Sequence, residues 1–290
     1  MDGHPALYSP TGYGLHDGEA VVRTPHTVKT LHGEAVDPVI ELLAAMDGET
    51  ARSELLEAVP AATAEHVDLL YEHGLAYNAD AIPAGLDDAC AGLLEPVLPA
   101  LPAASHHELP DRLGSKSVAI YGHREPISPV VDRLRAAGVS VTADPPAATA
   151  DPTGGPDVVF LSERLERSAS WAEANERWAA SESTLVKTRL TATGWRLGPV
   201  LTPTAPACLN CVYSRVDANK AGGRLFTEAV TGDPPHRRAY ADTVTELLFR
   251  TLLGQVPRYL DEQFVVYDHY DRTTETPRVF ALPHCEVCNV

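Results

Sequence analysis

TPTAPACLNCVYSR, residues Thr202–Arg215, carries a Cys-x-x-Cys pair where a loop gives way to a helical pattern. A second pair lies in LPHCEVCN, residues Leu282–Asn289. Two residues between thiols let both sulfurs reach one ion at about 2.3 Å, and four thiolates complete the tetrahedral coordination of a structural zinc ion. The sequence therefore predicts one zinc site, formed by Cys208, Cys211, Cys285 and Cys288.

Other chemistries also use paired cysteines, and three of them stay open beside zinc: two disulfides, a thioredoxin-like redox pair and an iron–sulfur site. A chain without a signal peptide disfavours disulfides, and neither pair follows the start of a βαβ unit, where the redox motif belongs. The gap from Cys211 to Cys285 is far longer than the roughly 15–20 residues between the knuckles of a zinc ribbon. We therefore expect the ion to fasten the chain's end to the middle of a domain.

One further cysteine, Cys90, and one histidine, His284, could in principle bind a metal ion but have a simpler interpretation. Cys90 stands alone on an apolar helical face, which is typical of a core residue. His284 lies beside a complete set of four thiolates, so we expect it to be exposed or to contact the ligands from outside. Neither is predicted to bind the ion.

The chain is strongly acidic and poor in lysine. Asp and Glu number 40 against 23 Lys and Arg, and the net charge is −17. A carboxylate-rich surface stays hydrated where salt shortens the Debye length to about 3 Å, so the composition predicts a halophilic host. It also disfavours nucleic acid as a partner, because phosphate binding requires cationic side chains and weakens as salt increases.

The chain has no segment that predicts a membrane location. No apolar run approaches the length of a membrane span, and MDGHPALYSPTGYG at the start lacks the basic and apolar regions of a signal peptide. The apolar fraction of 44% is ordinary for a globular chain. We therefore expect a soluble, cytoplasmic protein without a membrane partner.

Residues 1–81 have the pattern of a small module. Residues 12–24 predict a hairpin with its turn at Asp17–Gly18, and 26–31 predict a third strand. Apolar residues at helical spacing predict three helices, at 35–48, 50–59 and 63–75. Three strands followed by three helices describe a winged-helix-like fold.

Residues 82–114 are predicted to be a proline-rich linker with one amphipathic helix at 86–98. In residues 115–290, strands alternate with helices, so the predicted fold class is α/β with a mainly parallel sheet. The predicted strands are 116–122, 139–144, 157–162, 184–191 and 195–202. The predicted helices are 126–138, 168–181, 208–222 and 236–256. A terminal hairpin, from 263–271 and 277–283, is expected to carry the second cysteine pair.

The cysteine pairs in LGPVLTPTAPACLNC (197–211) and HCEVC (284–288) resemble those of the ThiF/MoeB class of ubiquitin-activating-enzyme-like adenylyltransferases. Active members of that class hold ATP with a G-x-G-x-x-G turn after the first strand. This chain has AIYGHREPISP (119–129), which keeps Gly122 and places Arg124, Glu125 and Pro126 where the later glycines belong. Proline lacks an amide donor and glutamate repels phosphate, so ATP is not expected as a cofactor.

The order of the two halves is similar to that of a ThiF-like subset without an intact ATP site, the partner proteins of thiazole/oxazole-modified microcin biosynthesis. Their N-terminal module resembles PqqD, and VDPVIELLAAMDGETARSELLEAV (36–59) followed by VDLLYEHGL (67–75) carries that resemblance here. The resemblance implies a non-catalytic protein that binds a precursor's leader peptide and presents it to a YcaO-type cyclodehydratase. It leaves a homodimer open.

By the same resemblance, the leader peptide is expected to add as a strand beside 26–31 and to lie against the third helix. The implied contacts are Thr27, Val28, Lys29, Thr30 and Leu31 on the strand and Val67, Leu70 and Tyr71 on the helix. From the pattern alone, Val67 and Leu70 are equally well explained as core residues. Lys29 is either a solvated surface residue or a partner for an acidic leader.

Two other functional classes stay open. A true adenylyltransferase acting on a sulfur-carrier protein requires the glycine turn that this chain lacks. A winged-helix transcriptional regulator requires cations on its third helix, and TAEHVDLLYEHG (63–74) has neither Arg nor Lys. HRRAY (236–240) is a basic cluster that marks either a helix start or a contact with a partner enzyme. Trp171, Trp178 and Trp195 are predicted to be core.

Overall fold

The computed structural model describes most of the chain, and its described residues form two compact units, divided between Arg112 and Leu113. The described ranges are 3–24, 27–83, 86, 88–101, 103–143, 155–163, 170–179, 181–219, 234–256, 260 and 263–288. Parts of the predicted elements 26–31, 86–98, 139–144, 168–181 and 208–222 fall between these ranges and lie outside the described residues, as does the side chain of Trp171. Each unit is described by itself.

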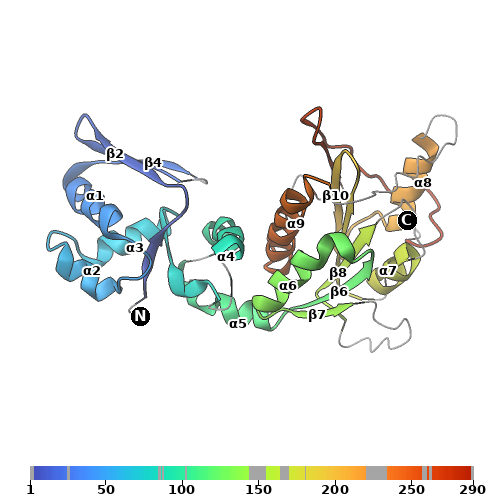
Figure 1. Ribbon diagram of the computed structural model, residues 1–290, viewed down its shortest axis with the longest axis horizontal. Helices are drawn as coiled ribbons and strands as arrows, with labels where there is room; N and C mark the ends of the chain where they lie inside the picture. The colour runs from blue at the N-terminus through green and yellow to red at the C-terminus, as the bar shows by residue number, and fades with distance from the viewer. Residues whose placement is uncertain are drawn as a thin grey trace. The chain divides into compact units, whose positions relative to one another are not determined.

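The first unit contains an antiparallel three-stranded sheet, β2 (Gly12–His16), β3 (Glu19–Arg23) and β4 (Val28–Leu31), in that order. Its β2–β3 hairpin turns at Asp17–Gly18, both with positive φ, which is the two-residue turn whose twist suits a hairpin. The predicted hairpin and third strand are confirmed, and β2 and β4 form the two edges of the sheet (Figure 1).

Three helices cover one side of this sheet: α1 (Val36–Ala45), α2 (Arg52–Ala58) and α3 (Ala64–Glu72). The predicted helices at these places are confirmed. Their apolar faces meet β3 in one core, because the helical spacing of the apolar residues puts them on one side of each helix. The fully buried members of this core include Val22, Val39, Leu42, Val67 and Leu70.

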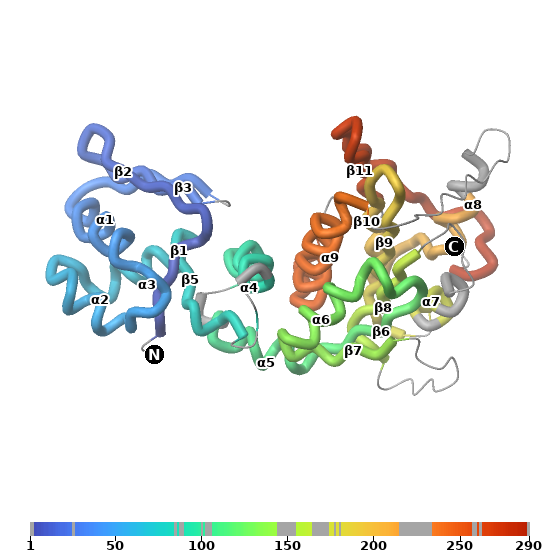
Figure 2. Tube along the Cα trace, viewed as in Figure 1, coloured from blue at the N-terminus to red at the C-terminus, as the bar shows by residue number. Residues whose placement is uncertain are grey.

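The first unit has a second, two-stranded sheet that the sequence did not predict. Its strands are β1 (Pro5–Leu7) and β5 (Ala76–Asn78), which lie side by side in Figure 2. Residues 88–101 and 103–112 pack onto this part of the unit, where Glu95 accepts hydrogen bonds from Ser9 N–H and the Tyr77 hydroxyl. The segment is helical, with α4 (Asp88–Leu94), two 3-10 helices (Glu95–Ala100 and Ala103–Glu108) and α5 (Leu109–Gly114). Cys90 is buried in it, as expected of a core residue.

The second unit is built on a seven-stranded sheet whose order is β12-β11-β10-β9-β8-β6-β7. The neighbours β7, β6, β8 and β9 are parallel, and the remaining strands are antiparallel, which confirms the α/β fold class. The strands are β6 (Ser117–Gly122), β7 (Ser140–Ala143), β8 (Val158–Glu163), β9 (Thr184–Leu190), β10 (Gly194–Leu201), β11 (Val265–Asp268) and β12 (Thr273–Glu275).

Helices cover both faces of this sheet (Figure 1). On one face lie α6 (Ser128–Ala136) and α9 (Arg237–Leu252), and on the other α7 (Ser170–Ala179) and α8 (Leu209–Asn219). Trp178 of α7 is buried in the core, as predicted, whereas Trp195 of β10 is half-buried and stacks on Tyr267 with ring centroids 4.3 Å apart. None of the described helices is long and apolar enough to cross a bilayer.

One predicted strand of the second unit is wrong. The return strand of the terminal hairpin is β12, not 277–283, which forms a single bridge, between Arg278 and Gln263. Pro277 explains the difference, because it has no N–H to donate and the ladder cannot continue through it. The chain beyond Val279 therefore leaves the sheet as a loop that ends in the second cysteine pair.

Candidate functional site

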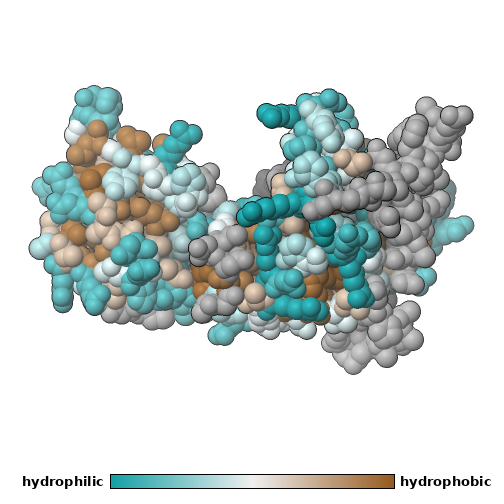
Figure 3. Space-filling view, in the orientation of Figure 1, coloured by the Kyte–Doolittle hydropathy of each residue, from teal (hydrophilic) through white to brown (hydrophobic). Residues whose placement is uncertain are grey.

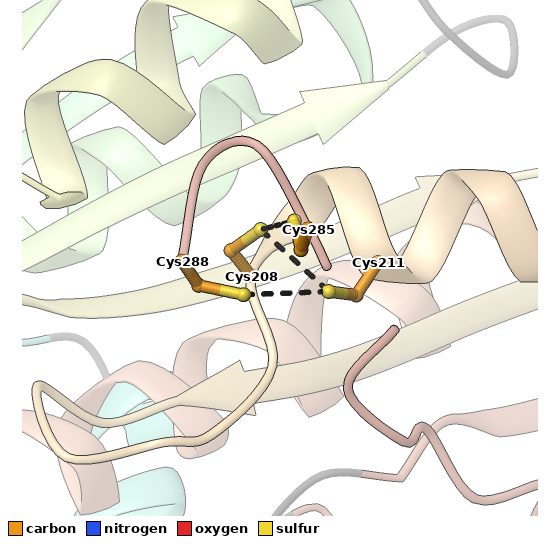
Figure 4. A group of neighbouring side chains, drawn as sticks. All are labelled: Cys208, Cys211, Cys285 and Cys288. Carbon is orange, nitrogen blue, oxygen red and sulfur yellow. Dashed lines mark hydrogen bonds between the residues drawn. The ribbon is translucent and has the colours of Figure 1, made fainter. Parts of the chain in front are cut away.

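The four paired cysteines meet in the second unit (Figure 4). Cys208 lies just before α8 and Cys211 in its first turn, while Cys285 and Cys288 lie in the C-terminal turn. Their sulfurs all lie within 4.8 Å of one another, and no other group of three or more such ligands exists among the described residues. The fold therefore brings the four predicted ligands together at one point, although the two pairs are far apart in the sequence.

The spacing of the sulfurs fits one ion. The Sγ atoms of Cys208 and Cys211 are 3.9 Å apart, those of Cys208 and Cys285 are 3.6 Å apart, and those of Cys211 and Cys288 are 3.5 Å apart. Four sulfurs at about 2.3 Å from a central ion in tetrahedral geometry lie about 3.8 Å from one another. A disulfide requires about 2.05 Å, and all four cysteines are free.

Neighbouring N–H groups stabilise negative charge on these sulfurs. The Leu282 N–H donates to Cys211 Sγ at 3.3 Å, and the Asn210 amide donates to Cys285 Sγ at 3.6 Å. Burial opposes ionisation of Cys285, but the backbone N–H groups of residues 288 and 287 and the Asn210 amide outweigh it and lower its pKa to about 6. Burial raises the pKa of the Cys208 thiol, because an apolar surrounding disfavours the charged thiolate.

The cysteine cluster is part of the hydrophobic core. Cys208 and Cys211 are fully buried, and Cys285 is nearly so, among Leu161, Val212 and other apolar side chains. The start of α8 is fixed from α7, because Asn175 Oδ1 accepts a hydrogen bond from Leu209 N–H at 3.0 Å. His284 is exposed, as expected. An ion here would therefore tie the chain's end to the sheet's core.

The crevice where a doubly wound sheet holds ligands lies at the carboxyl ends of β6 and β8, where the strand order reverses. Gly122 is at this point with φ +92°, and the next N–H, of His123, donates to Ser162 O at 2.7 Å. A Cβ at Gly122 would lie 2.2 Å from Ser162 O. This glycine therefore permits close approach of two strands, and the N–H that follows it is already bonded within the protein.

Gly122→Ala is expected to destabilise the second unit by more than about 3 kcal/mol, because the added methyl overlaps the Ser162 carbonyl. Gly254 is a matched control, since its φ is +75° but a Cβ there would meet nothing within 4 Å. Gly254→Ala should cost only the conformational strain, about 1–2 kcal/mol. Urea unfolding of both variants checks this, and equal losses would contradict it.

A buried ion pair joins β8 and β9. Lys187 Nζ of β9 is 3.1 Å from Glu163 Oε2 at the end of β8, and Tyr213 of α8 donates a hydrogen bond to the same carboxylate. Lys187 Nζ also lies 4.9 Å from the centre of the Tyr213 ring. The Glu163 side chain is fully buried. Through the Tyr213 hydroxyl, the pair connects α8 to β8 and β9. This pair was not predicted from the sequence, although Lys187-x-Arg189 in a predicted strand of a lysine-poor chain was a visible signal.

The edge strand β4 carries four of the predicted peptide contacts, and Thr27 immediately precedes it. Val28, Lys29 and Thr30 are exposed, while Thr27 and Leu31 are half-buried. Val28 has 59% of its surface exposed, and Tyr13 and Leu15 on the β2–β3 hairpin are exposed as well. Figure 3 shows hydrophobic surface on the first unit. The predicted strand residues are thus accessible.

The hydrogen bond that precedes β4 determines which of its residues direct their backbone groups to β3 and which direct them to the open edge. Thr24 N–H donates to Thr27 O at 2.9 Å, so these two form a hydrogen-bonded pair. Because such pairs alternate along an antiparallel ladder, Lys29 and Leu31 direct their backbone groups to β3. Val28 and Thr30 direct theirs to the open edge.

The predicted helix contacts differ among themselves. Val67 and Leu70 are fully buried in the core, as the alternative interpretation had them, and so they lie beneath the surface that a peptide would touch. Tyr71 is half-buried and, like Leu31, packs on the same core cluster from its edge. Burial raises the Tyr71 pKa to about 12, so its hydroxyl remains protonated.

HRRAY lies at a helix start, which is one of its two interpretations. His236 immediately precedes α9 and is buried, with Nε2 3.0 Å from Thr191 O. Arg237 donates to Glu125 O, in the short 3-10 helix Glu125–Ile127 that follows β6. Contact with a partner enzyme stays a prediction for this cluster.

No protein-family model matches the sequence, and no curated protein does. Solved structures match it in fold. A heterocyclase in complex with substrate and cofactor superposes with a TM-score of 0.66 at 14% identity, over 99% of this chain and 40% of that one. The heterocyclase TruD superposes with a TM-score of 0.65 at 13% identity, over 99% of this chain and 43% of that one. The chain therefore spans about two fifths of the length of these heterocyclases.

A third match is covered over the whole of both chains. Escherichia coli MccB, in a structure with selenomethionine MccA, has a TM-score of 0.59 at 10% identity, with 100% of both chains covered. This chain has the fold that these heterocyclases and MccB share. The resemblance drawn from the cysteine pairs and the N-terminal module is confirmed at the level of the fold.

Proposed function

We propose that this chain is a non-catalytic scaffold that binds the leader of a ribosomally made precursor peptide and presents it to a YcaO-type cyclodehydratase. The observation that carries the proposal is the open edge of β4, where the backbone groups of Val28 and Thr30 face outward beside accessible side chains. An added strand gains main-chain hydrogen bonds there, and its alternate side chains determine selectivity. Solved structures of the same fold contain a substrate, in the heterocyclase complex, or MccA, in the MccB complex.

The recognition module in this proposal is a winged-helix-like, PqqD-like fold at 1–81, followed by a linker at 82–114 and a degenerate ThiF-like domain at 115–290. The peptide contacts are Thr27, Val28, Lys29, Thr30, Leu31 and Tyr71, with Val67 and Leu70 supporting them from beneath. The partner enzyme supplies ATP and the ring-closing chemistry. The protein acts in the cytoplasm.

The proposed metal is a structural zinc ion held by Cys208, Cys211, Cys285 and Cys288. The donor set supports zinc over a multi-iron cluster, because all four sulfurs lie close enough to share one ion. Four thiolates leave no coordination position for substrate, so the ion supplies fold stability. The chain's own groups, Leu282 N–H and the Asn210 amide, orient two of the thiolates and stabilise their charge.

One observation favours a second candidate, an adenylating enzyme: MccB with ATP bound shares this fold, with a TM-score of 0.58. Against it, His123 N–H is bonded to Ser162 O, and Pro126 stands where the glycine turn should continue. Under the scaffold proposal, Mg-ATP leaves the melting temperature unchanged. A nucleotide present at a hundredfold its Kd would stabilise the protein by about 2.7 kcal/mol, so a clear upward shift would support the adenylating enzyme.

The proposal is tested by capture from the host. The tagged full chain, immobilised in a host extract, is expected to retain a YcaO-type enzyme together with a short peptide rich in Cys, Ser or Thr, both identified by mass spectrometry. The Thr30→Pro variant should retain the enzyme and lose the peptide. Recovery of a small carrier protein ending in two glycines would favour adenylation instead, and recovery of DNA alone would favour the transcriptional regulator.

A further inference from the structure

The two faces of β4 differ in a way that bears on which peptides it binds. In the β3–β4 ladder Lys29 lies opposite Val22 and Leu31 opposite Ala20, and both partners are fully buried beneath the helices. Residues directly opposite each other in a sheet share a face. Lys29 and Leu31 therefore lie on the helix side of the sheet, whereas Val28 and Thr30 lie on the outer side.

Lys29 is unusual in both charge and position. It is the sole lysine in the first 112 residues of a chain with net charge −17, and it is exposed in the middle of an edge strand. No carboxylate among the described residues forms an ion pair with it. Lysine on an edge strand also discourages pairing with a second copy of the chain, so the experiment below separates this role from recognition.

We infer that β4 selects peptides with an apolar residue followed, two positions later, by an acidic one. This inference rests on the proposed function and specifies its ligand. A strand added antiparallel, as in the rest of this sheet, places one residue opposite Lys29 and the residue two positions earlier opposite Leu31. The first position calls for a carboxylate. The second calls for an apolar side chain, because Leu31 and Tyr71 are the partly exposed edge of the core.

The phase of the ladder brings the charged pair close. Lys29 directs its backbone groups to β3, so with an added strand it forms a non-hydrogen-bonded pair, in which opposite side chains are nearer than in the alternate pairs. The residue between the apolar and acidic positions lies opposite Thr30 on the outer face and is expected to vary freely. The selected pattern is therefore apolar, any residue, acidic.

The expected preference is moderate and depends on salt. An opposite-charge pair across neighbouring strands favours binding by up to about fivefold over a neutral pair, and a like-charge pair disfavours it similarly. At about 1 M salt the Debye length falls to about 3 Å, so the preference for an acid shrinks while the apolar preference remains. The selection is therefore run at low ionic strength.

The probe is a library of random short peptides, selected for binding to the full-length chain. The wild type should enrich the apolar-x-acidic pattern, Lys29→Gln should keep the apolar position and lose the acidic one, and Lys29→Glu should enrich a basic residue in its place. Thr30→Pro should enrich no common pattern. Titrations of the best peptide and of its Glu-to-Gln or Asp-to-Asn form against wild type and Lys29→Gln then measure the pair directly.

The outcomes separate the inference from the proposed function. If the wild type and Lys29→Gln enrich the same pattern, or if the order of the two positions is reversed, the inference is overturned. If Thr30→Pro enriches the same peptides as the wild type, the β4 edge is not the binding site and the proposed function fails with it.

Discussion

Cys208→Ser is expected to release the metal and to unfold the second unit at ambient temperature. Cys208 is fully buried, and its sulfur lies within 3.9 Å of the sulfurs of Cys211 and Cys285. Serine in its place leaves a buried hydroxyl and only three thiolates to coordinate the ion. Structural zinc contributes about 10–16 kcal/mol of apparent binding free energy in small metal-folded domains, which exceeds the total stability of most domains. Zinc content and circular dichroism of the purified variant check the expectation.

The fifth cysteine provides the matched control. Cys90 is also buried, but it belongs to the first unit and is not a member of the group of four cysteines. Cys90→Ala should lower stability by about 1–2 kcal/mol and leave one zinc ion per chain. If Cys208→Ser retains zinc or melts like the wild type, the cluster does not hold the ion that stabilises the unit.

Thr30→Pro is expected to weaken binding of a leader peptide by tenfold or more without unfolding the sheet. The Thr30 N–H faces the open edge, where proline is tolerated in a strand. The substitution removes one hydrogen bond, which contributes about 1 kcal/mol, and its ring occupies the place of the incoming backbone. Fluorescence titration with a peptide recovered from the host, or selected from a random library, measures the loss.

Thr30→Val is the control for this prediction, because it changes the same exposed side chain and keeps the N–H. Valine also favours strand conformation, so the sheet should remain intact. Peptide affinity within about twofold of the wild type is expected. Equal affinity of the proline and valine variants would show that the peptide does not pair with β4.

Local patterns predicted much of this fold correctly. The Asp17–Gly18 turn requires positive φ at both positions, and the helical spacing around Val39 and Leu42 allows one buried face, so the hairpin and the first helix follow from short-range chemistry. The group of four cysteines was equally readable, because two Cys-x-x-Cys pairs are typical of thiols that share one metal ion.

Features that depend on distant partners escaped prediction. β1 is only three residues long and becomes a strand because Pro5–Leu7 pairs with Ala76–Asn78, a contact that no local pattern encodes. Glu163 and Lys187 form a pair only because β8 lies beside β9, so the KxR pattern signalled the lysine but not its partner. Val67 and Leu70 were ambiguous for the converse reason, since a helical apolar stripe looks the same whether it faces the core or a bound peptide.

Residue-resolved amide hydrogen exchange in β4, with and without a bound leader peptide, tests the central claim most directly. In the free protein the Val28 and Thr30 amides face the open edge and should exchange quickly, whereas the Lys29 and Leu31 amides are bonded to β3 and should already be protected. Peptide binding is predicted to protect Val28 and Thr30 selectively. A peptide that binds tightly and leaves these two amides unprotected would contradict strand addition at this edge.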